Sequence, residues 1–275
     1  MTRPKTTMRM DHFKKLVNQS KKIGAELISV FGYGEPLLDK SLSSKIKYCT
    51  KKGLKTFITT NAALLTPSVA GKLFDAGLTH MRLSAHGLWD SYEKVHKPLK
   101  FESFLRNVAN ALKMNEMVYK HGTNIDVTVI PMHNESIDEI LGFWKRFKID
   151  DLEIWRPHNW AGGRKYRKVI KRKKTCGRPF NGPIQINADG KMMVCCFDTD
   201  ATMTVGDTFK DSIEDILQGD EFKKIRKAHK AGDMSGLICE QCDQLNEYEK
   251  SPLLYSTIDP ACECGITSSM KVRLQ

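Results

Sequence analysis

The sequence predicts an α/β protein built on a parallel sheet, either doubly wound or barrel-like, followed by a smaller cysteine-bearing region. Two observations favour this class. Apolar, β-rich runs alternate with helical patterns up to Trp155, and the ends of those runs are rich in Gly, Thr, Asn, Ser and His. A chain of 275 residues can hold one large α/β domain, or a barrel and a small second domain.

Five apolar runs are expected to form strands, and the amphipathic segments that precede or follow them are expected to form helices. The strand candidates are Glu26–Phe31, Leu54–Thr60, Leu78–Ser84, Ile125–Pro131 and Leu152–Trp155. The helix candidates are Asp11–Ile23, Lys40–Lys51, Pro67–Asp75, Phe101–Lys120 and Ile137–Phe147.

Several helix ends can be read directly. Thr66 precedes Pro67, which places a capping hydroxyl before a proline at the first helical position. Ser136 and Glu139 have the spacing of a capping box. Glycines stand where three helices are expected to stop: Gly53, Gly77 and Gly122.

The helix expected at residues 11–23 has no strand before it, whereas each later helix up to residue 147 follows a strand. If the fold is a βα barrel or part of one, its first strand and first βα loop are not in this chain. We therefore expect a partial barrel that lacks its first strand.

The loop Gly32-Tyr33-Gly34-Glu35-Pro36 is the most specific of the polar strand ends. In parallel βα folds, ligands bind at the carboxyl ends of strands. Two glycines permit unusual φ angles and remove side chains, so that backbone carbonyls can reach a ligand ammonium. The carboxylate of Glu35 can hold that ammonium or cap the following helix. A plain Gly-Pro turn with a capping glutamate remains the alternative.

The pattern changes after Trp155. Residues 164–178 contain nine Lys or Arg and no acidic residue, which is typical of a solvated linker. Asp189-Gly190 between two β-like arms indicates a hairpin. Its second arm leads to Cys195 and Cys196, and neighbouring residues on a strand face opposite ways, so one of the two is expected to join a given site.

Cysteines from this region can assemble a site of four thiolates. Cys239-x-x-Cys242 places two on one tight turn, and Cys176 and Cys195 complete the set. Four thiolates suit zinc or an iron–sulfur cluster. Zinc ribbons normally bring two CxxC turns and this chain has one, so the sequence favours a cluster, with zinc as the alternative. Cys262-x-Cys264 is a weaker signal of surface thiols or a further ligand pair.

The composition and the N-terminal sequence indicate the compartment of the protein and the charge of its partners. The N-terminus lacks the apolar stretch of a secretory signal and no run approaches a membrane span, so we expect a cytoplasmic protein with reduced thiols. The formal net charge of +12 suggests an acidic partner or substrate, with nucleic acid as one option.

The loop and the cysteines together resemble the radical S-adenosylmethionine (SAM) superfamily with a C-terminal SPASM or twitch domain. In that family a "GGEP"-type loop binds the methionine ammonium of SAM, and Gly32 to Pro36 match it with Tyr33 at a position that is often glycine. Asn61 and Ser84 would lie near the ribose. The resemblance implies an auxiliary [4Fe–4S] cluster on Cys176, Cys195, Cys239 and Cys242, reductive SAM cleavage, and hydrogen abstraction from a peptide, protein or small-molecule substrate.

One family motif is not matched: the CxxxCxxC loop that binds the SAM cluster does not occur in this sequence. The resemblance therefore implies a protein that is inactive alone unless a second chain supplies that loop. We expect a partial barrel at residues 1–160, a basic linker at 161–178, a SPASM or twitch domain at 176–250 and a tail at 251–275. A non-catalytic module that binds nucleic acid, stabilised by zinc or a cluster, is the alternative function.

Overall fold

A computed structural model describes residues 3, 5–133, 135–247 and 252–254 of the chain. The chain divides into two compact units. Among the described residues, one unit contains residues 24–133, 135–156 and the β9 strand, and the other joins residues 3 and 5–23 to residues 157–247. No described helix is both long and apolar enough to cross a membrane.

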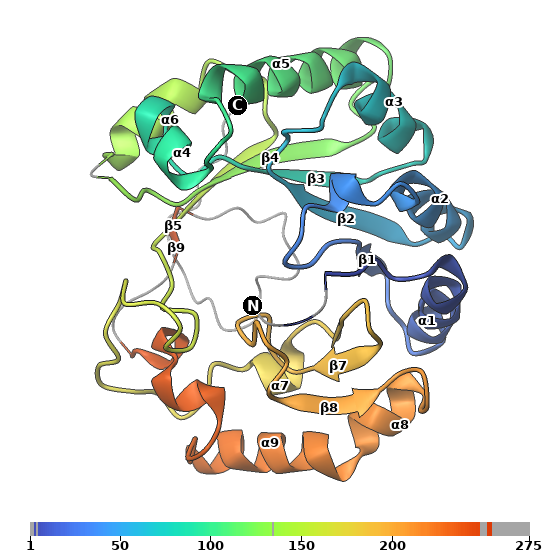
Figure 1. Cartoon of the computed structure of the whole chain (residues 1–275), viewed down its shortest axis with the longest axis vertical. Coiled ribbons are helices and arrows are strands. Elements are labelled where there is room, and N and C mark those ends of the chain that lie inside the picture. Colours follow the sequence, from blue (N-terminus) through green and yellow to red (C-terminus); the bar gives the residue numbers. More distant parts are fainter. Residues whose placement is uncertain (1–2, 4, 134, 248–251, 255–275) are drawn as a thin grey trace. The chain divides into compact units, whose positions relative to one another are not determined.

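The first unit is built on a parallel sheet, as the sequence predicts (Figure 1). Neighbouring strands pair in the order β1-β2-β3-β4-β5, and a short β9 pairs with β5 in the antiparallel sense. The strands are β1 (Leu27–Ser29), β2 (Lys55–Thr60), β3 (His80–Ser84), β4 (Asn124–Val129), β5 (Asp151–Trp155) and β9 (Pro252–Leu254).

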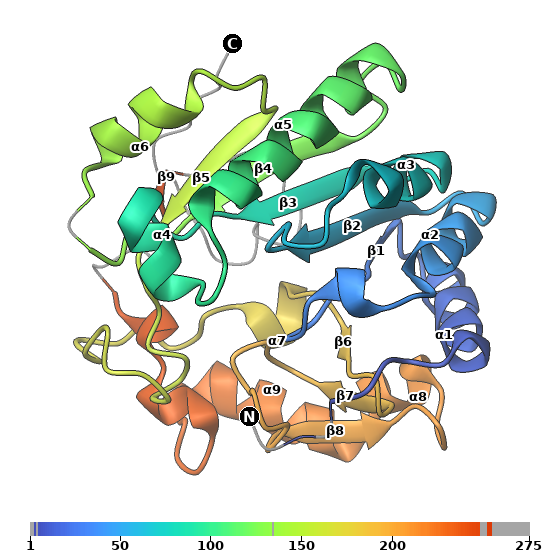
Figure 2. The same cartoon turned by 45° about the horizontal axis from the view of Figure 1, so that its top comes forward.

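Helices cover one face of this sheet (Figures 1 and 2). Apolar strand residues such as Met81, Leu83 and Val127 pack with Phe104 and Trp144 of the helices in one buried core. Alternate residues of each strand point to the opposite face. The helical elements are η1 (Pro36–Leu38), α2 (Leu42–Lys51), α3 (Pro67–Asp75), α4 (Trp89–Val95), α5 (Phe101–Met117) and α6 (Ile137–Trp144).

Most of the expected helix ends are confirmed. The Thr66 hydroxyl accepts a hydrogen bond from the Val69 amide, and Ser136 and Glu139 form a reciprocal capping box. Gly53 and Gly77 have positive φ directly after their helices. The expectation for Gly122 is wrong: α5 ends at Met117, and Lys120 and His121 adopt the left-handed conformation instead.

The second unit contains α1 (Met10–Lys22) and a small antiparallel sheet. The predicted hairpin at Asp189-Gly190 is confirmed: Gly190 has φ +81°, and β6 (Gln185–Ile186) pairs with β7 (Lys191–Met193). A third strand, β8 (Thr204–Asp207), was not predicted. The remaining elements are α7 (Arg178–Asn181), α8 (Ile213–Gln218), α9 (Asp220–Ala231), η2 (Ile238–Gln241) and η3 (Asp243–Leu245).

Contacts across the sequence hold this unit together. Buried His12 of α1 shares a 3.0 Å hydrogen bond between its Nε2 and the hydroxyl of Thr208. Gln19 accepts a hydrogen bond from the Ile213 amide at the start of α8. Helices α8 and α9 pack on β8 through a core that includes Ile216 and Phe222. The N-terminal helix therefore belongs to the same compact unit as the cysteine-bearing region.

Candidate functional site

The loop at residues 32–36 follows β1 and leads into η1. A Cβ atom added at Gly32 or Gly34 would meet no atom within 4 Å, so both positions lie beside open space. Neither glycine is among the residues with positive φ. The expectation of unusual φ angles is therefore wrong, whereas the absence of side chains does leave the loop backbone accessible. Tyr33 is half-buried and Pro36 is buried.

The carboxylate of Glu35 ties this loop to the end of β2. Its Oε1 accepts hydrogen bonds from the Leu37 amide (3.0 Å) and the Thr60 hydroxyl (2.6 Å), and its Oε2 accepts one from the Asn61 amide (2.9 Å). The capping role expected for Glu35 is thus confirmed at η1. Three donors on one carboxylate fix the loop relative to the neighbouring strand end.

Two further predicted residues lie at strand ends. Asn61 directly follows β2, and its side-chain oxygen accepts a hydrogen bond from the Ala63 amide (2.9 Å). Ser84 is the last residue of β3, where it pairs in register with Thr128 of β4. The carboxyl ends of parallel strands form the edge at which ligands bind. The structure joins Glu35 to Asn61 directly, while Ser84 lies one strand further along this edge.

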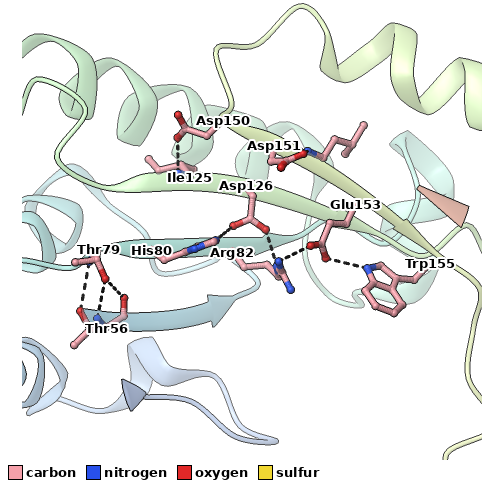
Figure 3. A network of polar contacts seen from close by, with 11 residues as sticks. Thr56, Thr79, His80, Arg82, Ile125, Asp126, Asp150, Asp151, Glu153 and Trp155 are labelled. Atoms are coloured by element: carbon pink, nitrogen blue, oxygen red, sulfur yellow. Dashed lines mark hydrogen bonds and ion pairs between the residues drawn. The ribbon is translucent and has the colours of Figure 1, made fainter. Parts of the chain in front are cut away.

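The face of the sheet opposite the helices carries a buried ionic network that the sequence analysis missed (Figure 3). Arg82 of β3 donates from Nε to Asp126 of β4 (2.6 Å) and from Nη2 to Glu153 of β5 (2.8 Å). His80 bonds the other oxygen of Asp126. The indole of Trp155 donates to Glu153 (2.9 Å). The sequence does contain a sign of this network, because polar residues stand two positions apart in these otherwise apolar strands.

These charges are compensated within the network. Burial alone raises the pKa of Asp126, but Arg82 and His80 outweigh that effect and hold the carboxyl pKa below its usual value. The Arg82 guanidinium also lies over the ring of Phe57, 5.2 Å from its centroid. Strands β2 to β5 are thereby linked on this face by polar and cation–π contacts.

The predicted metal ligands all belong to the second unit. Cys176 lies just before α7, Cys239 is in η2, and Cys242 follows it. Burial raises the pKa of Cys239 to about 11 and that of Cys242 to about 12, and the nearby charge of Cys176 contributes to both shifts. Cys176 is thus close enough to Cys239 and Cys242 for its charge to act on both, and both of these thiols are largely desolvated.

Cys195 and Cys196 both lie beyond the end of β7, so the argument from strand alternation does not apply to them. A hydrogen bond between the two thiols raises the pKa of Cys195 and lowers that of Cys196 to about 6, and Arg178 lowers both. The Phe197 amide donates to the sulfur of Cys195 (3.4 Å).

The zinc or cluster site expected on Cys176, Cys195, Cys239 and Cys242 stays a prediction. Among the described residues, no three His, Cys, Asp or Glu side chains are disposed to hold one metal ion. Four thiolates are ligands that both zinc and a [4Fe–4S] cluster take, so these residue types fit either occupant. Cys49 is buried in α2 of the other unit, and Cys262 and Cys264 lie outside the described residues.

A buried polar clamp that sequence reasoning also missed holds the CxxC turn. Asp243, fully buried next to Cys242, pairs with Arg167 (3.2 Å between Oδ2 and Nη1) and accepts the Asn159 amide (3.1 Å). In return, the Asn159 side chain accepts the Asp243 amide and donates to the Gln241 carbonyl. This arrangement fixes the backbone that carries the two thiols.

Two family models match this chain. Residues 1–143 match the Radical SAM superfamily, and residues 176–243 match SPASM, an iron–sulfur cluster-binding domain. Among curated relatives, PqqA peptide cyclase of Bradyrhizobium diazoefficiens is 28% identical over 130 residues, which cover 44% of this chain and 34% of the cyclase. Fe-coproporphyrin III synthase of Methanosarcina barkeri is 30% identical over 35% of this chain and 24% of the synthase. The alignments thus span about a third or less of these curated relatives.

Solved structures share the fold. BtrN in complex with AdoMet and 2-DOIA superposes with a TM-score of 0.62 at 22% identity, covering 92% of this chain and 89% of that chain. SuiB of Streptococcus suis bound to the precursor peptide SuiA gives a TM-score of 0.64 at 16% identity, over 90% of this chain and 65% of that chain. Because the family match covers more than half of the sequence, the chain belongs to the radical SAM superfamily, and it carries a C-terminal SPASM iron–sulfur cluster-binding domain.

Proposed function

We propose that this chain binds SAM and an auxiliary [4Fe–4S] cluster and takes part in hydrogen abstraction from a peptide, protein or small-molecule substrate. The observation that supports this most is the succession of an open glycine loop on a parallel sheet and a thiol-rich SPASM domain in one chain. One curated relative is called a peptide cyclase, and SuiB has been solved with a precursor peptide. Peptides are therefore the substrate class that we favour.

In this proposal the backbone of residues 32–36 receives the methionine end of SAM, and Glu35 keeps the loop fixed. Asn61 and Ser84 lie along the same strand-end edge and would contact the ribose. Bound SAM would supply radical chemistry once an iron–sulfur cluster gives it one electron. The chain's own residues orient SAM and substrate.

Cys176, Cys195, Cys239 and Cys242 would hold the auxiliary cluster, which exchanges an electron or helps to place the substrate. Zinc on the same thiolates is the competing occupant. We propose a reducing compartment such as the cytoplasm, where these thiols would be available as metal ligands.

The eight cysteines of the sequence include no CxxxCxxC spacing. We therefore propose that reductive SAM cleavage requires such a loop from a second chain or from a longer form of this one. The domain limits expected from the sequence, 1–160, 161–178, 176–250 and 251–275, belong to the same proposal, as does a partial barrel that lacks its first strand.

Replacing Gly34 with alanine tests the SAM loop without disturbing the fold. The added methyl group meets open space and the φ angle suits alanine, so the free energy of unfolding should change by no more than about 0.5 kcal/mol. The same methyl group would stand where the ligand approaches the backbone. We expect at least about tenfold weaker SAM binding, equivalent to roughly 1.4 kcal/mol, measured by ligand-observed NMR titration.

Gly142→Ala is the matched control, because Gly142 in α6 also has open space at its Cβ position. It should leave SAM binding unchanged. Equal SAM affinity in Gly34→Ala and the unmodified protein, or no SAM binding by the unmodified protein, would contradict the proposal.

A further inference from the structure

We propose that residues 164–174, named here the basic strap, form the docking surface for an acidic protein that carries one electron. The inference rests on the proposed cluster site, because an electron carrier needs a redox partner. Four features of the strap support it: a fixed backbone, exposed cations, apolar side chains among those cations, and direct contact with the CxxC turn.

The strap has a fixed backbone, unlike the solvated linker that the sequence predicts. The Lys173 amide donates to the Leu245 carbonyl (2.8 Å), and the Glu247 amide donates to the Lys171 carbonyl (2.9 Å). Asn246 accepts the Ile170 amide and donates to the Lys168 carbonyl, each at 3.0 Å. These four hydrogen bonds hold the strap along residues 245–247, which follow Cys242. The side chains of the strap therefore project from a fixed backbone.

Those side chains are strongly cationic. The exposed Lys and Arg of the strap are Arg164, Lys165, Lys168, Lys171, Arg172 and Lys174. Lys171 pairs with Glu247, whereas Lys165, Lys168 and Lys174 have no carboxylate partner in the described part of the chain. Such a concentration of one charge attracts a partner of the opposite sign and accelerates its association at low salt.

Two apolar side chains interrupt the charges. Tyr166 is 49% exposed and Ile170 is 44% exposed. Protein interfaces combine charged rims with apolar or aromatic anchors, and tyrosine is enriched among these anchors. A patch with this composition fits a folded acidic protein better than small anions.

The strap also contacts the proposed cluster ligands. Arg172 donates from Nη2 to the carbonyl of Cys239 at 2.5 Å, so the docking surface and the ligand turn are joined by one hydrogen bond. In the transfer, the reduced carrier loses one electron and the oxidised cluster gains it, with no bond made or broken. A partner docked on the strap would thus stand close to its redox target.

The test measures how fast a reduced plant-type ferredoxin, an acidic one-electron protein, reduces the cluster of the full chain in stopped-flow absorbance. The variant is Lys165→Glu/Lys168→Glu/Lys174→Glu. The matched control, Lys47→Glu/Lys55→Glu/Lys94→Glu, changes the net charge equally at exposed positions of the sheet-bearing unit. Dithionite serves as a small reductant that needs no docking surface.

We expect the strap variant to slow reduction by ferredoxin at least about tenfold at low ionic strength, and salt to reduce the difference. The control variant should keep the unmodified rate, and dithionite should reduce all three proteins equally. Equal ferredoxin rates in both variants would overturn the proposal. Loss of oligonucleotide or acidic-peptide binding in the strap variant, with an unchanged ferredoxin rate, would also overturn it and assign the strap to that ligand. Absence of iron and sulfide would instead refute the underlying cluster site.

Discussion

At the scale of single residues, each unit is organised by a carboxylate that accepts several donors. Glu35 joins a glycine loop to the end of β2, and Asp243 joins the CxxC turn to Asn159 and Arg167. Both stand next to residues that are proposed to bind a cofactor. Charge-assisted hydrogen bonds of this kind fix geometry as well as contributing stability, so the binding residues are held in place before any ligand arrives.

Replacing Arg82 tests whether the buried carboxylates of the sheet depend on a cationic partner for stability. In Arg82→Met the carboxylates of Asp126 and Glu153 would remain buried without their shared partner. Breaking a buried pair in this way typically costs 3–5 kcal/mol, so the free energy of unfolding should fall by about that amount in urea titrations.

The control for this prediction is Arg106→Met at an exposed position of α5, which should change stability by less than about 0.5 kcal/mol. Adding Asp126→Asn and Glu153→Gln to Arg82→Met should recover much of the loss, because no uncompensated charge then remains. A loss of similar size in Arg106→Met, or no loss in Arg82→Met, would show that the network does not stabilise the sheet.

At the scale of elements, the loop between β3 and α4 is held by stacked rings. His86 lies against His96 with ring centroids 5.3 Å apart, and His96 lies against Tyr92 at 4.3 Å. The His86 amide donates to Nε2 of His96 (3.3 Å). His86 lies two residues after Ser84, so the stack holds the loop that follows one of the proposed SAM contacts.

The stack makes stability depend on pH. Burial lowers the pKa of His86 to about 3, helped by His96, and lowers that of His96 to about 4. In the unfolded chain each would titrate near 6.5, so the unfolded state binds protons first as the pH falls. Stability should be unaffected above about pH 6.5 and decline down to about pH 4. Each histidine would contribute a loss of about 2 kcal/mol between pH 7 and pH 5.

Urea titrations at pH 7 and pH 5 measure this effect. His96→Gln should show a smaller loss between the two pH values than the unmodified protein, whereas His133→Gln, at an exposed position, should match the unmodified protein. Equal pH dependence in all three proteins would exclude the stack as the cause.

Local sequence signals predicted most of the first unit and less of the second. Strands β1 to β5 and their helices follow from periodicity and caps, which act over a few residues. Helix α4 was missed because it is short and begins after Leu88, which offers no capping side chain. The Arg82 network and the pairing of α1 with α8 depend on residues distant in sequence, so no local pattern specifies them.

At the scale of the whole molecule, one chain carries a parallel sheet of the radical SAM type and a cluster-binding SPASM domain. The cysteine spacing predicted a thiol-rich region, and Cys176, Cys195, Cys239 and Cys242 all belong to one compact unit. The functional proposals for both units depend on which metal occupies this region. A cubane makes the SPASM domain a redox centre, whereas zinc would make it a structural element.

Iron, acid-labile sulfide and zinc per chain, measured on protein prepared without oxygen, test this claim most directly. We predict about four irons and four sulfides in the unmodified protein, and loss of both in Cys239→Ser and Cys242→Ser. Cys49→Ala, which removes a buried thiol of the other unit, should keep the full content. About one zinc without sulfide, or iron that survives both serine substitutions, would contradict the account.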